Sequence, residues 1–119
     1  MLATIVELMQ ANLGAVFNER DADRRKAAIA RTYAPDVTFS DPEETVTGHE
    51  AIEAKARALL DQAPAFVFTP AGDVHVVQDL GYLAWSLGPE GEPPVVRGVD
   101  VALVKDGLIA NLYTVLLTT

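Results

Sequence analysis

Apolar residues in the first half of the chain recur at helical spacing. In the first segment they fall three or four residues apart on one helix face, at Ile5, Leu8, Met9, Leu13, Val16 and Phe17. A second helix is predicted from a cap at Asp21 through Tyr33. Pro35 ends it because the residue before a proline disfavours the α conformation. Thr47 and Glu50 have the spacing of a capping box, which predicts that a third helix starts there and stops at Pro64.

The second half of the chain predicts strands. A short strand at Val37–Ser40 precedes the third helix, and four longer β-rich runs follow it: Ala65–Val77 with a bulge at residues 70–72, Leu80–Leu87, Val95–Val104 and Leu108–Leu117. The connections between the later runs are short, and Asp106-Gly107 predicts a tight turn, so the sheet should be antiparallel. Helices first and a sheet afterwards make the predicted class α+β.

The predicted strands are apolar on both faces. In the run Val95–Val104, alternate valines, alanine and leucine point to each side, and Leu108–Leu117 repeats this pattern. Helices can cover one face only. We therefore expect a homodimer through the outer face of the sheet, unless a tightly curled sheet buries more of itself.

The amino-acid composition excludes several classes of site and partner. The 119 residues are 50% hydrophobic, enough for one domain over residues 1–119 with its own core. The absence of cysteine excludes disulfides, thiolate metal sites and cysteine nucleophiles. A net charge of −8 argues against nucleic acid and anionic membranes as partners. No secretory signal and no run of about 20 apolar residues is present, so a soluble cytoplasmic protein is expected.

Two acids occupy unusual positions. Asp100 lies within an apolar run on the face of Val96, Ala102 and Val104. A buried carboxyl must be paired, hydrogen-bonded or neutral, as is common in functional sites. The alternatives are a structural pair with an arginine, or a bulge at Gly98 that turns Asp100 to water. Asp41, before Pro42, is either catalytic or the opening residue of a turn that it caps itself.

The remaining candidates form an aromatic set. Six residues are predicted to line an apolar substrate pocket, with ordinary core as the alternative for any single one: Phe17, Tyr33, Phe39, Phe66, Trp85 and Tyr113. His49 and His75 lack acids at ligand spacing, so no metal site is predicted. The chain has no nucleophile elbow, phosphate loop or dinucleotide fingerprint, and no cofactor is expected.

The chain resembles SnoaL-like members of the nuclear transport factor 2-like superfamily, which includes ketosteroid isomerases and polyketide cyclases. Four segments carry the resemblance: residues 33–42, 46–52, 97–101 and 106–109. It implies three helices packed into a strongly curved antiparallel sheet, a cystatin-like cone that encloses a deep pocket and is often dimeric.

The resemblance also implies roles. Asp41 falls where ketosteroid isomerases have the aspartate that shuttles the substrate proton, and Asp100 where they have the protonated aspartate of the oxyanion hole. Phe17 and Ala56 stand where those isomerases have tyrosines, and neither offers a donor. Two hypotheses follow: a cofactor-independent isomerase or cyclase for a small hydrophobic carbonyl compound, or a non-catalytic binding or scaffold protein with the same pocket.

Overall fold

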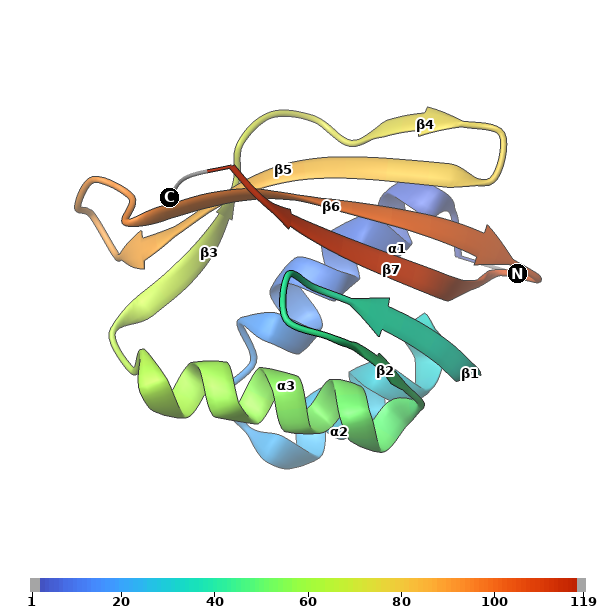
Figure 1. Ribbon diagram of the computed structural model, residues 1–119, viewed down its shortest axis with the longest axis horizontal. Coiled ribbons are helices and arrows are strands. Elements are labelled where there is room, and N and C mark those ends of the chain that lie inside the picture. Colours follow the sequence, from blue (N-terminus) through green and yellow to red (C-terminus); the bar gives the residue numbers. More distant parts are fainter. Residues whose placement is uncertain (1–2, 118–119) are drawn as a thin grey trace.

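The computed structural model describes residues 3–117. Its helical part comes first: α1 (Ile5–Ala11) continues into a π-helical segment, η1 (Asn12–Phe17), and is followed by α2 (Ala22–Thr32) and, after two strands, α3 (His49–Gln62). The first predicted helix is therefore one continuous element with a wider second half. Figure 1 shows the helices gathered on one side of the sheet.

The strands within these residues form one sheet. They are β1 (Tyr33–Ser40), β2 (Thr45–Thr47), β3 (Phe66–Pro70), β4 (His75–Val77), β5 (Leu80–Pro89), β6 (Val96–Lys105) and β7 (Leu108–Leu116). The order is β2-β1-β7-β6-β5-β3, with β4 also paired to β5. The pairs joined by short connections are antiparallel, as predicted. The β1–β7 pair is parallel, which corrects the prediction of a wholly antiparallel sheet. These two strands are distant in sequence, so no tight turn constrains their relative direction.

Three local predictions are corrected. The capping box of this structure belongs to α1, with Thr4 as the N-cap and Glu7 in the first turn. The N-cap of α3 is Gly48, at φ 96°, with no side-chain hydrogen bond, so the Thr47–Glu50 box is wrong. Tyr33 begins β1 instead of ending α2, and Pro35 lies inside that strand.

The run predicted as one bulged strand is divided. It forms β3 and β4, which pair with different stretches of β5: Phe66–Pro70 with 85–89, and His75–Val77 with 80–82. Glycine at position 72 has φ 116° and marks the break between the two strands.

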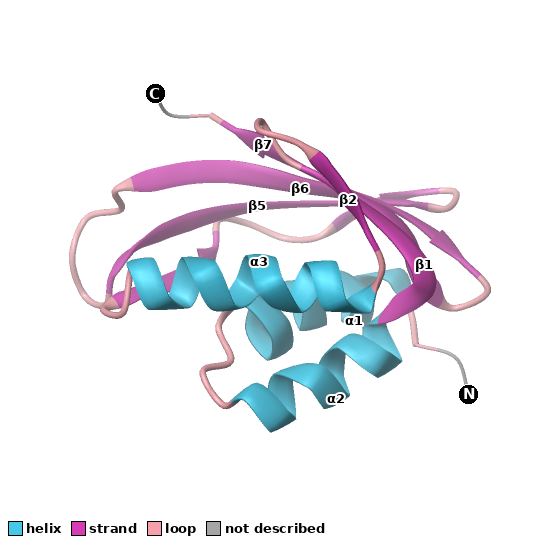
Figure 2. Ribbon diagram, turned by 60° about the horizontal axis from the view of Figure 1, so that its bottom comes forward, coloured by secondary structure: helices cyan, strands magenta, loops and turns pink. Residues whose placement is uncertain are grey.

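The sheet curls around the helices, and the core lies in between (Figure 2). Its buried residues come from every layer, for example Met9, Val16, Ile52, Leu83 and Leu112. At Gly81 the contact is so close that an added Cβ would lie 2.7 Å from the side chain of Ile5. α1 is therefore seated directly on the backbone of β5.

The outer face of the sheet stays open in the monomer. Cross-strand register places Val101 between Tyr82 and Tyr113, and both tyrosines are exposed. Val115, in the next row, is exposed as well. None of the described helices is long and apolar enough to cross a membrane.

Candidate active site

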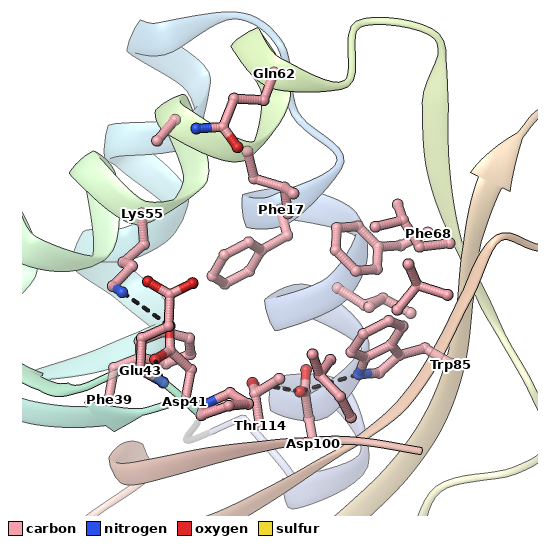
Figure 3. Close-up of a pocket in the computed structure, with 17 residues that line it drawn as sticks. Phe17, Phe39, Asp41, Glu43, Lys55, Gln62, Phe68, Trp85, Asp100 and Thr114 are labelled. Atoms are coloured by element: carbon pink, nitrogen blue, oxygen red, sulfur yellow. Dashed lines mark hydrogen bonds and ion pairs between the residues drawn. The ribbon is translucent and has the colours of Figure 1, made fainter. Parts of the chain in front are cut away.

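A cavity of about 390 Å³ opens between α3, η1 and the concave face of the sheet. Its wall is mainly apolar and aromatic, with a few polar groups: Leu13, Phe17, Phe39, Asp41, Pro42, Glu43, Lys55, Ala58, Leu59, Gln62, Phe68, Trp85, Leu87, Val96, Asp100, Thr114 and Leu116. Figure 3 shows Asp41 and Lys55 on one side and Asp100 with Trp85 on the other. Both candidate acids thus border one space.

Asp100 is buried, with 5% of its surface exposed. Oδ1 accepts hydrogen bonds from Trp85 Nε1 at 3.0 Å and Thr114 Oγ1 at 2.8 Å, and Oδ2 accepts one from Asn12 Nδ2 at 2.8 Å. Burial raises the pKa of Asp100, although these three donors act in the opposite direction. The carboxyl is neither paired with an arginine nor turned to bulk water.

Asn12 extends this network to Tyr33. The Tyr33 hydroxyl donates to Asn12 Oδ1, and both residues are almost completely buried. Sequence reasoning missed Asn12. The available signal was its spacing, four residues after Leu8 and three after Met9, which places a polar side chain on the apolar helix face. Asn12 begins the π-helical segment, a geometry often found at functional sites.

The Asp41 carboxylate has three partners in the structure. Its Oδ1 accepts from the backbone N–H groups of Glu43 and Glu44 at 2.9 and 3.0 Å, and its Oδ2 lies 2.8 Å from Lys55 Nζ. Burial alone would raise the pKa of Asp41, but Lys55 and the two backbone donors outweigh it and lower this pKa. Asp41 therefore caps its own turn and also borders the cavity.

Lys55 was not singled out from the sequence. Besides Asp41, it contacts Glu44 Oε2 at 2.6 Å and lies 6.0 Å from the centre of the Phe39 ring. It occupies the same α3 face as Leu59 and Gln62, which also line the cavity. A lysine next to an apolar helix stripe is common on surfaces, so the sequence carried no specific signal.

The aromatic candidates divide into two groups. Phe17, Phe39 and Trp85 line the cavity, joined by Phe68, whose ring centroid lies 5.0 Å from that of Trp85. Tyr33, predicted to line the pocket, is instead completely buried outside the cavity wall and donates a hydrogen bond to Asn12.

Two further predicted pocket residues, besides Tyr33, lie outside the cavity wall. Phe66 packs against the core outside the cavity wall. Tyr113 is 43% exposed, because its neighbour Thr114 takes the inward position in β7. Neither position suits a substrate in this cavity.

The histidines make no metal cluster. His49 Nε2 lies 2.9 Å from the carbonyl oxygen of Tyr33, and His75 is exposed beside Tyr82. Within residues 3–117, no group of three or more His, Cys, Asp or Glu side chains could hold a metal ion.

Comparison with known proteins places the chain in a family. The family model described as "SnoaL-like domain" matches residues 12–112, so the chain belongs to this family. Solved structures agree. A "putative isomerase of the SnoaL-like family" from Agrobacterium tumefaciens strain C58 is 26% identical, with a TM-score of 0.85 over 92% of this chain and 93% of that one.

Two more distant structures share the fold. A "putative SnoaL-like polyketide cyclase" from Jannaschia sp. CCS1 is 17% identical, with a TM-score of 0.78 over 94% of this chain and 84% of that one. An NTF2-like protein of unknown function from Cytophaga hutchinsonii is 14% identical, with a TM-score of 0.71 over 98% and 92%. No curated protein matches this chain. The predicted NTF2-like α+β fold is confirmed.

Proposed function

We propose that this SnoaL-like domain is a cofactor-independent isomerase or cyclase that acts by acid–base chemistry on a small hydrophobic carbonyl compound. One observation carries the proposal: Asp41 and Asp100 border the same aromatic cavity, and their surroundings shift their pKa values in opposite directions. Such divergence assigns the acid and the base in acid–base enzymes. The names of structural relatives, an isomerase and a polyketide cyclase, support the same class of reaction.

In this proposal the two acids have complementary roles. The Asp41 carboxylate removes a proton from the carbon next to the carbonyl, and the electron pair of that C–H bond moves into an enolate. Asp100 donates a hydrogen bond or its proton to the carbonyl oxygen, where the negative charge develops. Return of the proton from Asp41 to another carbon of the conjugated system gives an isomer. Attack of the enolate carbon on a second carbonyl moves the π electrons of that carbonyl to its oxygen, which takes the proton back from Asp41 and completes a ring.

The remaining wall orients the substrate. Phe17, Phe39 and Trp85 give the cavity flat apolar surfaces and leave few polar groups to compete with the two acids. Holding the reacting carbon beside Asp41 and the oxygen beside Asp100 replaces a bimolecular encounter by an oriented contact.

The test uses cyclohex-3-enone in D₂O. Conversion to cyclohex-2-enone is followed by ultraviolet absorbance, and deuterium uptake by NMR. The wild type should accelerate both, and Asp41→Asn and Asp100→Asn should each slow them by on the order of 10²–10³-fold. Asp36→Asn, an exposed aspartate on β1, is the matched control and should leave the rate unchanged.

A second candidate function is ligand binding without chemistry. The contacts of Asp41 with Lys55 and two backbone amides reduce its basicity, and Phe17 offers no hydrogen-bond donor. A ketone that binds in the cavity without gaining deuterium or isomerising would favour this candidate and reject the enzyme.

A further inference from the structure

Three described side chains hydrogen-bond the Asp100 carboxyl group, and each of them donates. Trp85 and Thr114 donate to Oδ1, and Asn12 donates to Oδ2. An indole N–H can only donate, but a carboxamide can offer either its NH₂ group or its oxygen. The orientation of Asn12 therefore decides whether Asp100 Oδ2 faces a donor or an acceptor.

Tyr33 decides that orientation. Its hydroxyl is completely buried and donates to Asn12 Oδ1, which turns the NH₂ group of Asn12 towards Asp100. If the Asn12 amide were rotated by half a turn, its NH₂ group would face Tyr33, and the Tyr33 hydroxyl hydrogen would lose its acceptor, Asn12 Oδ1. A buried donor without an acceptor is costly. Among the described residues, no buried side-chain polar atom lacks a partner, as expected for a network in this one orientation.

We propose that Tyr33 and Asn12 are positioning residues that force the proton of Asp100 to point into the cavity, so that the site selects a ligand with a neutral acceptor oxygen. The indole N–H of Trp85 can only donate to Oδ1, and Thr114 donates to the same oxygen, so a proton on Oδ2 keeps both hydrogen bonds. There it meets the NH₂ group of Asn12, which cannot accept it. A carbonyl oxygen in the cavity supplies the missing acceptor.

Charge at the other side of the cavity narrows the ligand class. Lys55 is the one cationic residue of the described cavity wall, and its ammonium group contacts both Asp41 and Glu44. Glu43 adds another carboxylate to the wall. A ligand carboxylate would find no uncommitted cation there and would face acidic side chains. The ligand is therefore a ketone or ester in preference to a free acid, an inference that rests on the proposed function for the place of the carbonyl.

The experiment compares 2-decalone carrying a ¹³C-labelled carbonyl with decalin, which has the same rings and no oxygen. Isotope-edited infrared spectra are recorded at a pH where Asp100 is protonated. Bound to the wild type, the carbonyl band should move to lower wavenumber. In Tyr33→Phe the Asn12 amide is free to turn and accept the Asp100 proton. The band shift should then be lost, and ketone affinity should fall roughly three- to tenfold with decalin unaffected.

The matched control is Tyr82→Phe, which removes a hydroxyl from the exposed outer face of the sheet. It should keep the wild-type band and affinity. A Tyr33→Phe protein that folds and keeps both would overturn the proposal, as would binding of decalin-2-carboxylate more tightly than 2-decalone.

A second measurement covers the case in which Tyr33→Phe does not fold. In wild-type protein, the hydrogens of the Asn12 side-chain amide should show NMR contacts on the Asp100 side, both with Asp100 ionised and with it protonated. Rotation of the amide towards Tyr33 on protonation would reject the inference. Neither measurement needs turnover, so absence of isomerisation would reject the proposed function alone.

Discussion

The ammonium group of Lys55 lies 2.8 Å from Oδ2 of Asp41, joining the middle of α3 to the turn after β1. The pair borders the cavity, with most of both side chains buried, and a second contact from Lys55 to Glu44 holds the ammonium group in place. This contact favours the ionised form of Asp41, and it links the turn after β1 to the position of α3.

Lys55→Gln should raise the pKa of Asp41, because the variant removes the ammonium hydrogen bond and charge that help lower it. ¹³C NMR titration of the Asp41 carboxyl measures this directly. If Asp41 is the base, the acidic limb of the pH–rate profile should move to higher pH by the same amount. Lys105→Gln, at the exposed end of β6, is the control. An unchanged Asp41 titration in Lys55→Gln would contradict the assignment.

Trp85 should report the ionisation of Asp100, because it is the chain's only tryptophan and donates to Oδ1 of that residue. Its emission should change at a pH above the ordinary aspartate range, since burial raises the pKa of Asp100. Tyr33 also senses Asp100, but its own pKa is far higher, so it does not titrate in this range. The transition should disappear in Asp100→Asn. Its persistence there would assign it to another group.

Gly98→Ala should displace Trp85, which donates to Asp100, because position 98 lies against the indole. A Cβ at this position would lie 2.8 Å from the carbonyl oxygen of Val115 and collide with the indole of Trp85. We expect a loss of about 1–3 kcal/mol in the free energy of unfolding and a red shift of Trp85 emission. Gly14→Ala has nothing within 4 Å of the added methyl group and should be neutral or slightly stabilising. Equal effects of the two alanines would argue against a close contact at Gly98.

The buried ion pair of Arg25 and Glu53 joins α2 to α3 through contacts of 2.7 and 2.8 Å. Glu53→Leu leaves Arg25 buried without its carboxylate and should cost roughly 3–5 kcal/mol, whereas the double variant Arg25→Met/Glu53→Leu should cost much less. Urea unfolding measures both, with the exposed Glu50→Leu as control.

The pH dependence of this pair has a defined sign. Arg25 lowers the pKa of Glu53 in the folded protein. The stability it contributes is present above the pKa of the unfolded chain, about 4.3, and is lost as the pH falls through the folded value. The difference between wild type and double variant should therefore shrink in acid. If the difference in unfolding free energy between the two proteins did not change with pH, the Arg25–Glu53 pair would not be the source of the pH dependence.

We propose that a second copy covers the outer face of the sheet, where Tyr82, Val101 and Tyr113 form one apolar row. Val115→Asp should then shift the protein from dimer to monomer in analytical ultracentrifugation. Val6→Asp places the same change on the helical side, at a valine of comparable exposure, and should leave the dimer intact. A monomeric wild type would reject the proposal.

The hydrophobic periodicity of the sequence predicted most helices and strands, because short-range spacing and turn residues determine them. The three-and-four spacing from Ile5 to Phe17 requires one buried helix face, and the turn at Asp106-Gly107 requires antiparallel neighbours. Asp100 stood out for the same reason, since a carboxyl in an apolar strand needs partners wherever that strand lies. The segments that resemble the SnoaL-like family added the curved sheet and the helix packing.

The partners themselves depend on contacts between residues far apart in the chain. Asn12 and Asp100 are 88 positions apart, and only the curl of β6 over η1 brings them to 2.8 Å. Lys55 meets Asp41 for a similar reason. The sequence by itself determined which residues must be buried and which strands are neighbours in a hairpin. The tertiary structure decided that the parallel β1–β7 pair joins the β1–β2 hairpin to the rest of the sheet, that Tyr113 turns outward, and that Tyr33 donates to Asn12. Such choices depend on the packing of the whole chain.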